Sequence, residues 1–499
     1  MNTEDPWAAT RESLNSLLER LESPETAHYT LEQLEQTIGE MGREVERQAL
    51  QGRLHRQTQH EQHMEEVYDA QGVEHSHVEA QHVRTLGTVF GEVQFTRLAY
   101  RQRGHANLHP ADAALQLPEE SYSYSLRRLA AIEAARGSYG EAVERIACST
   151  RAPKTELHKR QIEELAQRAA QDFDDFYAAA EPPAPAAEEL LCMSCDGKGI
   201  VMIPDALRPA TAKAAAKAGR KLATRLSKGE KPNRKRMAEV GAVFTVKPVP
   251  RTPEDILGPP GQKRRKLGPH ASGKWVMASV VEDAAAVIGR VFDEAERRDP
   301  RHAATWLALV DGNRDQIRYI RAEARRRGVR VTILVDFIHV LEYIWGAAWC
   351  FFDASSATDA EAWVLAKGRA LLAGDASLVA AAIRRKATTL KLKPDKRLSV
   401  DRCADYLLHK QPHLDYPSAL RQGWPIATGV IEGTCRHLVK DRMDVTGARW
   451  GLQSAEAVLK LRALRTNGDF NRYWTYHLTR EYQRVHAARY ADATVPAAY

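Results

Sequence analysis

The chain has 499 residues, which at about 150 residues per domain corresponds to roughly three domains. With 43% hydrophobic and 27% charged residues, it has the composition of an ordinary globular chain that can form a sizeable core. No run approaches the roughly 20 apolar residues of a membrane span, the N-terminus lacks the pattern of a secretory signal, and six cysteines are too few for a disulfide scaffold. We therefore expect a cytoplasmic protein, neither embedded in a membrane nor exported.

The formal net charge of +7 is unevenly distributed. Between Arg208 and Arg236 there are eleven Lys or Arg residues and a single acid, Glu230, so this segment alone carries more positive charge than the whole chain. A concentrated basic segment on an otherwise slightly acidic body is typical of a protein that binds a polyanion, most often nucleic acid.

The N-terminal part is predicted to be helical over residues 1–83. Four leucines recur there at helical spacing, namely Leu14, Leu17, Leu18 and Leu21. The His- and Gln-rich stretch 53–82 is interpreted as solvated helix or coil, not as a metal site. In region 84–115, β-forming residues around Gly87 and Gly91 predict a β-hairpin.

Residues 116–180 are predicted to return to helix and to contain a helix-turn-helix candidate. Ala142, Val143 and Ile146 would face inward from its first helix, and Pro153 suits the opening turn of the second. The second helix would present basic side chains to DNA, namely Lys154, Lys159 and Arg160. An ordinary helical hairpin with a solvated face explains the pattern equally well.

A Pro- and Ala-rich linker at 181–189 precedes an apolar strand, LLCMSCDGKGIVMI, that contains Asp196. We treat about 204–275 as a basic insert, although MAEVGAVFTVKPV at 237–249 is strand-like. Two groups of basic residues in this insert are predicted to contact DNA. The first lies on one helical face, namely Lys213, Lys217, Arg220, Lys221 and Arg225, and the second lies in a loop, namely Lys263, Arg264, Arg265 and Lys266.

From residue 275 short apolar strands alternate with amphipathic helices, which predicts an α/β fold with parallel strands and helical cover. TWLALV at 305–310 ends at Asp311, and VRVTILV at 329–335 ends at Asp336. The predicted regions are a first part of the core at 190–352, a helical insertion at 353–424, a final core helix at 425–460 and a helical tail at 461–499.

Three acids are candidate catalytic residues because of where they lie. Asp196 is inside an apolar strand, where a charge is costly unless it is paired or bound to metal. Asp311 follows an apolar strand, and ligands of open α/β sheets bind beyond strand ends. Glu432 begins a helix after a Thr-Gly turn, with Arg436 and Lys440 expected on the same face, next to a phosphate backbone.

Three converging carboxylates would supply the hard oxygen ligands that Mg²⁺ requires, and two such ions catalyse in-line phosphoryl transfer. Each acid alone has a simpler explanation. The Asp-Gly at 311 resembles a plain turn, and Glu432 suits the first turn of any helix. Asp336 is the rival for the second acid because it also ends an apolar strand.

The order strand-Asp, strand-Asp, helix-Glu resembles the ribonuclease-H-like core of DDE transposases. DGNRDQIRYI, ILVDFIHVLEYIW and PIATGVIEGTCRHLVKDRMDVTGARW, with GEVQFTRLAY and SCDGKGIVM earlier in the chain, resemble the ISKra-four family of bacterial insertion-sequence transposases, which is related to the Mutator-like group. The resemblance implies Asp196, Asp311 and Glu432 as ligands of two Mg²⁺ or Mn²⁺ ions. It also implies that Asp336 and His339 support the site.

One departure from the family concerns cysteine. Relatives often carry zinc-ribbon cysteines after the hairpin, but here the sequence is YRQRGHANLHPAD, with His105 and His109, so we predict no zinc there. Cys192 and Cys195 are interpreted as core residues, since no second cysteine pair follows at metal-ligand spacing.

The function that the resemblance implies is transposition. The enzyme would bind the terminal inverted repeats, hydrolyse the ends and join the 3′-hydroxyls to target DNA, as an oligomer on double-stranded DNA. Arg442 and Arg449 are predicted phosphate contacts, while Trp450 is expected in the core. The alternatives are a nuclease without strand transfer, or a domesticated or inactive transposase that only binds DNA.

Overall fold

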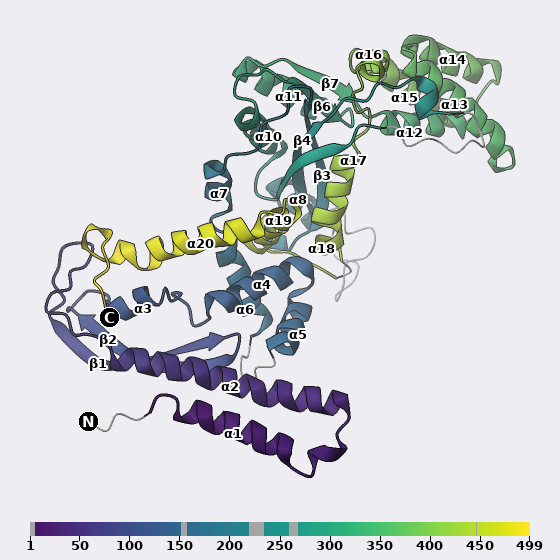
Figure 1. Cartoon of the computed structure of the whole chain (residues 1–499). Coiled ribbons are helices and arrows are strands. Elements are labelled where there is room, and N and C mark those ends of the chain that lie inside the picture. The colour runs from purple at the N-terminus through teal and green to yellow at the C-terminus, as the bar shows by residue number, and fades with distance from the viewer. Residues whose placement is uncertain (1–4, 151–156, 219–233, 259–267, 446) are drawn as a thin grey trace. The chain divides into compact units, whose positions relative to one another are not determined.

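The computed structural model describes residues 5–150, 157–218, 234–258, 268–445 and 447–499. These form two compact units, the first from residues 1–179 and 468–499 and the second from residues 180–467 (Figure 1). No helix of the described residues is long and apolar enough to cross a membrane.

The first unit begins with two helices that precede a long antiparallel hairpin. Its opening elements are α1 (Ala8–Glu22), α2 (Leu31–Gln59), β1 (His77–Thr88) and β2 (Gly91–Arg101). Side-chain hydrogen bonds fasten α2 to β2, since the Thr58 hydroxyl donates to the carbonyl of Thr96 at 2.7 Å. The predicted hairpin is confirmed, but it begins already at His77, where helix or coil was expected. The start of β1 is polar and mostly exposed, so no apolar alternation marks it in the sequence.

Five further helices complete most of the first unit, namely α4 (Tyr124–Arg136), α5 (Tyr139–Thr150), α6 (Lys159–Ala169), α7 (Phe173–Ala179) and α20 (Phe470–Val485), with a short α3 (Pro110–Ala114). Ala142 and Ile146 are buried as predicted, whereas Val143 is only half-buried. Helix α6 begins at Lys159, whereas Pro153, predicted in the opening turn of the second helix, lies outside the described residues. Fully buried Arg127 connects α4 to α20 through an ion pair with Glu481.

The second unit is built around a mixed five-stranded sheet, with order β5-β4-β3-β6-β7. Its strands are β3 (Leu190–Val201), β4 (Lys235–Val246), β5 (Ala271–Ser279), β6 (Thr305–Val310) and β7 (Val331–Val335). β4 pairs antiparallel with β3 and β5, whereas β6 is parallel to β3 and β7 is parallel to β6. The predicted α/β class is therefore confirmed.

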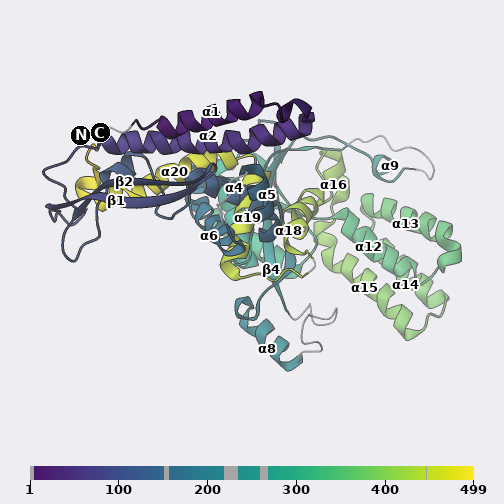
Figure 2. The ribbon, with the colours of Figure 1, turned by 90° about the horizontal axis from the view of Figure 1, so that it is seen from below.

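Strands β4 and β5 correct the boundary of the basic insert, because two of the five strands come from the region 204–275. β4 pairs with β3 and β5 across polar connecting segments, and these segments made residues 237–249 look like part of an insert and not a strand of the central sheet. Helix α8 (Pro209–Ala218) of this region extends away from the sheet, as Figure 2 shows.

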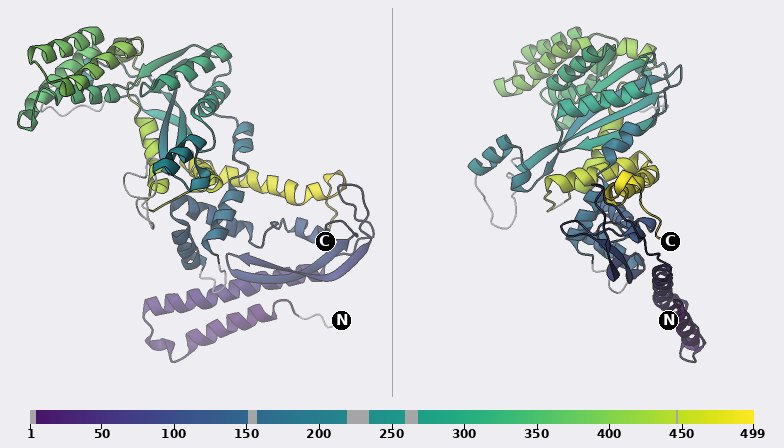
Figure 3. Two further views of the ribbon diagram at one scale, coloured as in Figure 1. Left: turned by 180° about the vertical axis from the view of Figure 1, so that it is seen from behind. Right: turned by 90° about the vertical axis from the view of Figure 1, so that its left-hand side faces the viewer.

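Helices cover and extend the sheet. α10 (Ala284–Arg298) packs on β4, since the side chains of Val291 and Val287 approach Gly241 closely. A helical group to one side of the sheet (Figure 3) occupies the predicted helical insertion. The remaining helices are α9 (Pro253–Ile256), α11 (Arg314–Arg327), α12 (Phe337–Ala348), α13 (Ala357–Leu372), α14 (Ala376–Thr389), α15 (Pro394–Lys410), α16 (Tyr416–Arg421), α17 (Gly429–Thr434), α18 (Asp441–Met443) and α19 (Leu452–Thr466). Helix α19 runs across the predicted boundary at residue 460.

Candidate functional site

Asp196 and Asp311 lie at the same level on neighbouring strands. The parallel register of β3 and β6 pairs Ser194 with Leu309, and each acid comes two residues after its member of that pair. Residues at one level of adjacent parallel strands point to the same side of a sheet, and such strands lie about 4.8 Å apart. Both acids line one cavity of about 460 Å³.

The Asp311 turn is held by its neighbours. The Asp311 Oδ1 accepts a hydrogen bond from the backbone nitrogen of Asn313 at 2.8 Å, and the Tyr406 hydroxyl donates to the Asp311 carbonyl at 3.0 Å. Gly312 has φ +93°, and a Cβ there would lie 2.5 Å from the Tyr406 hydroxyl. The turn therefore requires glycine and leaves the Asp311 side chain exposed toward the cavity.

Glu432 reaches this region from helix α17. The Thr428 hydroxyl oxygen lies 3.1 Å from the Glu432 Oε1, and the thiol of Cys435, nearly one turn after Glu432, donates to the Asp196 Oδ2 at 3.4 Å. Glu432 itself is exposed and is not among the residues that line the cavity. The helix thus brings its acid beside the Asp196 strand, and the carboxylate lies next to Thr428.

Asp336 has a different environment from Asp311. It is 1% exposed and caps the N-terminus of α12, because its Oδ1 accepts from the backbone nitrogen of Ile338 at 2.6 Å. Its Oδ2 accepts from the backbone nitrogen of Thr428 at 2.9 Å and from the Thr428 hydroxyl. Both oxygens of the rival acid are therefore engaged in holding the Thr428 turn, and His339 lies beside Glu342, with 3.2 Å between the Nδ1 and an Oε2.

Glu239 and Cys195 are among the cavity-lining residues that sequence reasoning did not assign to the site. Glu239 lies on β4 opposite Gly197 and lines the cavity, and burial together with the Asp196 charge raises the pKa of its carboxyl. Its position depends on the pairing of Gly197 with Glu239, which no local pattern reveals. Cys195, predicted to be a core residue, is half-buried and lines the same cavity, whereas Cys192 is buried as predicted.

The predicted phosphate contacts have mixed environments. Arg449 is exposed, but Arg442 is 4% exposed and lies over the ring of Trp450, whose centroid is 4.6 Å away. Trp450 is buried, as predicted. Arg436 and Lys440 are exposed, but a π-helical turn, η6 (Cys435–Lys440), changes the spacing on which their common face with Glu432 was predicted.

The other predicted DNA contacts are described only in part. Lys159, Lys213 and Lys217 are exposed, and Arg160 pairs with Glu164 at 2.8 Å. The remaining predicted contacts lie outside the described residues, namely Lys154, Arg220, Lys221, Arg225, Lys263, Arg264, Arg265 and Lys266.

A separate group in the first unit could hold a metal ion. The Asp69 Oδ2 lies 2.8 Å from the Nδ1 of His105 and 3.3 Å from the Nε2 of His75. His75 is 1% exposed, which corrects the interpretation of 53–82 as solvated, and its Nδ1 contacts the Tyr100 carbonyl at 3.1 Å. Imidazole and carboxylate are Zn²⁺ ligands, so the prediction that excluded zinc from cysteine content alone overlooked this group. In the segment after the hairpin, His109 stacks on His82, and burial lowers the pKa of His109 to about 4.

Comparison with known proteins gives no family: no family model matches the chain, and no curated protein matches it. Function is therefore argued from the residues of the site.

Proposed function

We propose that the protein is a DDE-type DNA transposase that cleaves the ends of an insertion sequence and joins the freed 3′-hydroxyls to target DNA. The observation that carries the proposal is the common level of Asp196 and Asp311 at the edge of one cavity. Two acids that are far apart in the sequence meet there in the order that the resemblance implies.

We further propose that the second unit is a ribonuclease-H-like core. Support comes from one mixed sheet in which the strand bearing Asp196 is parallel to the strand that leads to Asp311. Helix α17 then supplies Glu432 next to the same strand. The helical group α13–α16 falls between the second and third acids, as the family pattern implies.

The acids fit a pair of hard divalent cations. Carboxylate oxygens are the ligands that Mg²⁺ and Mn²⁺ prefer, and the Asp311 side chain remains exposed to the cavity although its Oδ1 accepts from the Asn313 backbone nitrogen. When bound, such ions activate the attacking hydroxyl and stabilise the leaving oxygen of the phosphodiester. Asp196, from within β3, and Asp311, from the end of the adjacent β6, would hold the ions, and Glu432 would complete the ligand set.

The remaining residues position these groups. Asp336 fixes the turn at Thr428, and the Thr428 hydroxyl oxygen lies next to the Glu432 carboxylate. Tyr406 and Gly312 fix the carbonyl and the backbone path at Asp311. Because two element ends must be joined to one target, we propose that the protein acts as a homo-oligomer on double-stranded DNA.

The test uses labelled duplexes made from the DNA that borders the gene on each side. The parent protein with Mg²⁺ or Mn²⁺ is expected to release 3′-hydroxyl ends at one boundary sequence and to join pre-cleaved ends to a plasmid. Asp196→Ala is expected to do neither. Cleavage without joined product would favour the nuclease, and binding without cleavage would favour the DNA-binding alternative.

A further inference from the structure

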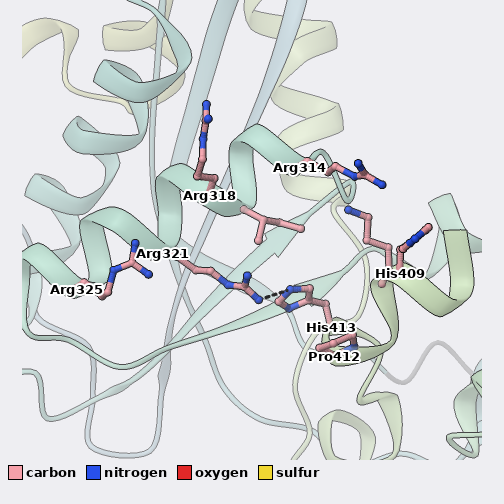
Figure 4. Close-up of a pocket in the computed structure, with 9 residues that line it drawn as sticks. Arg314, Arg318, Arg321, Arg325, His409, Pro412 and His413 are labelled. Carbon is pink, nitrogen blue, oxygen red and sulfur yellow. Dashed lines mark hydrogen bonds between the residues drawn. The ribbon is translucent and has the colours of Figure 1, made fainter.

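A second cavity of the same unit, of about 500 Å³, is lined by cations and by no acid (Figure 4). One wall is helix α11, which begins three residues after Asp311 and contributes Arg314, Arg318, Arg321 and Arg325, of which Arg318 pairs with Asp315 at 2.9 Å. The spacing of four, three and four residues puts these four side chains on one helical face. The opposite wall is the end of α15 and the turn after it, with Lys410 and His413.

Lys410 is the unusual residue of this wall. It is 8% exposed, although a buried ammonium is costly unless it is paired. Burial and the Arg314 charge lower its pKa, and Asp311 opposes that effect from nearby. Among the described residues no carboxylate forms an ion pair with Lys410, Arg314 or Arg325. The fold thus places an uncompensated buried cation among arginines.

One contact orders the floor of the cavity. The His413 Nδ1 lies 3.3 Å from the Ile333 carbonyl, an acceptor, so that nitrogen carries the proton and the Nε2 accepts from Arg321 at 2.9 Å (Figure 4). Burial and Arg321 lower the pKa of His413, which keeps it neutral in this role. Arg321 is therefore oriented in advance by a neutral acceptor, with its charge not neutralised.

The length of the basic face indicates the kind of ligand. At 1.5 Å per residue, Arg314 and Arg325 are about 16 Å apart along α11. A single inorganic phosphate spans only a small part of that length, whereas successive phosphates of a nucleic-acid strand extend along it. The face also begins beside Asp311, so a strand lying on it would lead to the candidate catalytic cavity.

We propose that this cavity and the basic face of α11 bind the phosphodiester backbone of the DNA that flanks the cleaved phosphate. The inference rests on the proposed function for its substrate, but its test does not require cleavage. Lys410 would neutralise one phosphate in the recess, and the arginines would hold the neighbouring ones.

The experiment measures binding of a fluorescent 30-base-pair duplex by the full chain with Ca²⁺ in place of Mg²⁺, over a series of salt concentrations. The pocket variants are Lys410→Met and the double variant Arg314→Gln/Arg321→Gln. The control is Arg326→Gln, which removes one positive charge from helix α11. Arg326 is exposed, pairs with Glu323 and does not line the cavity. Lys410→Arg tests whether charge alone restores binding, and the melting temperature of each variant checks folding.

We expect each pocket variant to bind about tenfold or more weakly and to lower the slope of log affinity against log salt by about one per charge removed. Arg326→Gln is expected to bind like the parent, and Lys410→Arg is expected to recover most of the affinity. Three results would overturn the proposal. They are pocket variants that fold and bind like the parent, displacement of the duplex by millimolar inorganic phosphate at constant ionic strength, and a preference for double-stranded RNA. If the protein binds DNA through the pocket but never cleaves it, only the transposase assignment is rejected. If the pocket variants cleave DNA like the parent, only the DNA-binding role of the pocket is rejected.

Discussion

Asp196, within β3, and Asp311, directly after β6, lie at the same level of two parallel strands, 115 positions apart in the sequence, and line one cavity. The register of β3 and β6 requires this proximity, whatever the surrounding loops do. The proposed chemistry depends on it, because shared metal ions need carboxylates from both strands.

Replacing either acid by its amide is expected to abolish DNA cleavage while leaving DNA binding intact. Metal-assisted charge stabilisation contributes several kcal/mol, and each ~1.4 kcal/mol is a factor of ten, so Asp196→Asn and Asp311→Asn are each expected to lower the cleavage rate about 10³-fold or more. Asp205→Asn, at an exposed acid of the same unit, is the matched control. Normal cleavage by Asp311→Asn would reject it as a metal ligand.

Asp336 is expected to act mainly through stability. Asp336→Ala removes an N-cap and leaves the buried Thr428 groups without their acceptor, so the free energy of unfolding should fall by about 2 kcal/mol or more. Asp336→Asn keeps one acceptor oxygen and should lose less. Urea unfolding measures the difference. If Asp336→Ala left stability unchanged but stopped cleavage, the second catalytic acid would be Asp336.

The turn at Gly312 is expected to tolerate no side chain. Gly312→Ala places a Cβ at positive φ against the Tyr406 hydroxyl, which should cost about 1–3 kcal/mol and displace Asp311. We expect a lower melting temperature and at least tenfold slower cleavage. Adding Tyr406→Phe removes the obstructing hydroxyl but not the backbone strain, so partial recovery is expected. Full activity of the single variant would show that the Asp311 turn is not held as described.

Glu61 predicts a pH dependence of the first unit. Burial raises the pKa of its carboxyl to about 7, while the backbone nitrogen of Leu98 donates to it at 3.0 Å. The folded state holds this proton more tightly than the unfolded chain, so its stabilising effect is complete below about pH 4.5 and is lost as the pH rises through 7. After discounting for solvent screening, the change is about 1–2 kcal/mol.

The measurement for Glu61 is the free energy of unfolding of the parent minus that of Glu61→Gln, from pH 4 to pH 8. The difference isolates Glu61 from His109, whose lowered pKa acts in the opposite direction. Exposed Glu65→Gln is the control. A difference that stays constant across this range would contradict the buried environment of Glu61.

Local patterns in the sequence predicted much of the second unit. β6, β7 and the strand with Asp196 were found because each is a short apolar run that ends or is interrupted at an acid. The α/β class and the helical group after residue 353 followed from the same periodicity.

The missed features depend on long-range pairing. The place of β4 in the sheet, and with it Glu239 opposite Gly197, follows from hydrogen bonds between strands and not from any motif. His75 looked solvated because its neighbours are polar, yet contacts with Asp69 and the Tyr100 carbonyl bury it. The cavity at Lys410 joins side chains of α11 and α15 that are more than 80 positions apart in the sequence, so no local pattern revealed it.

The most direct test of the central claim uses Fe²⁺ in place of Mg²⁺, with ascorbate and hydrogen peroxide, to cut the polypeptide wherever the metal binds. The account predicts cuts near residues 196, 311 and 432 in the same molecule, suppressed by excess Mg²⁺ and lost in Asp196→Asn. Cuts confined to residues 69–105, or present at only one of the three acids, would contradict a shared metal site.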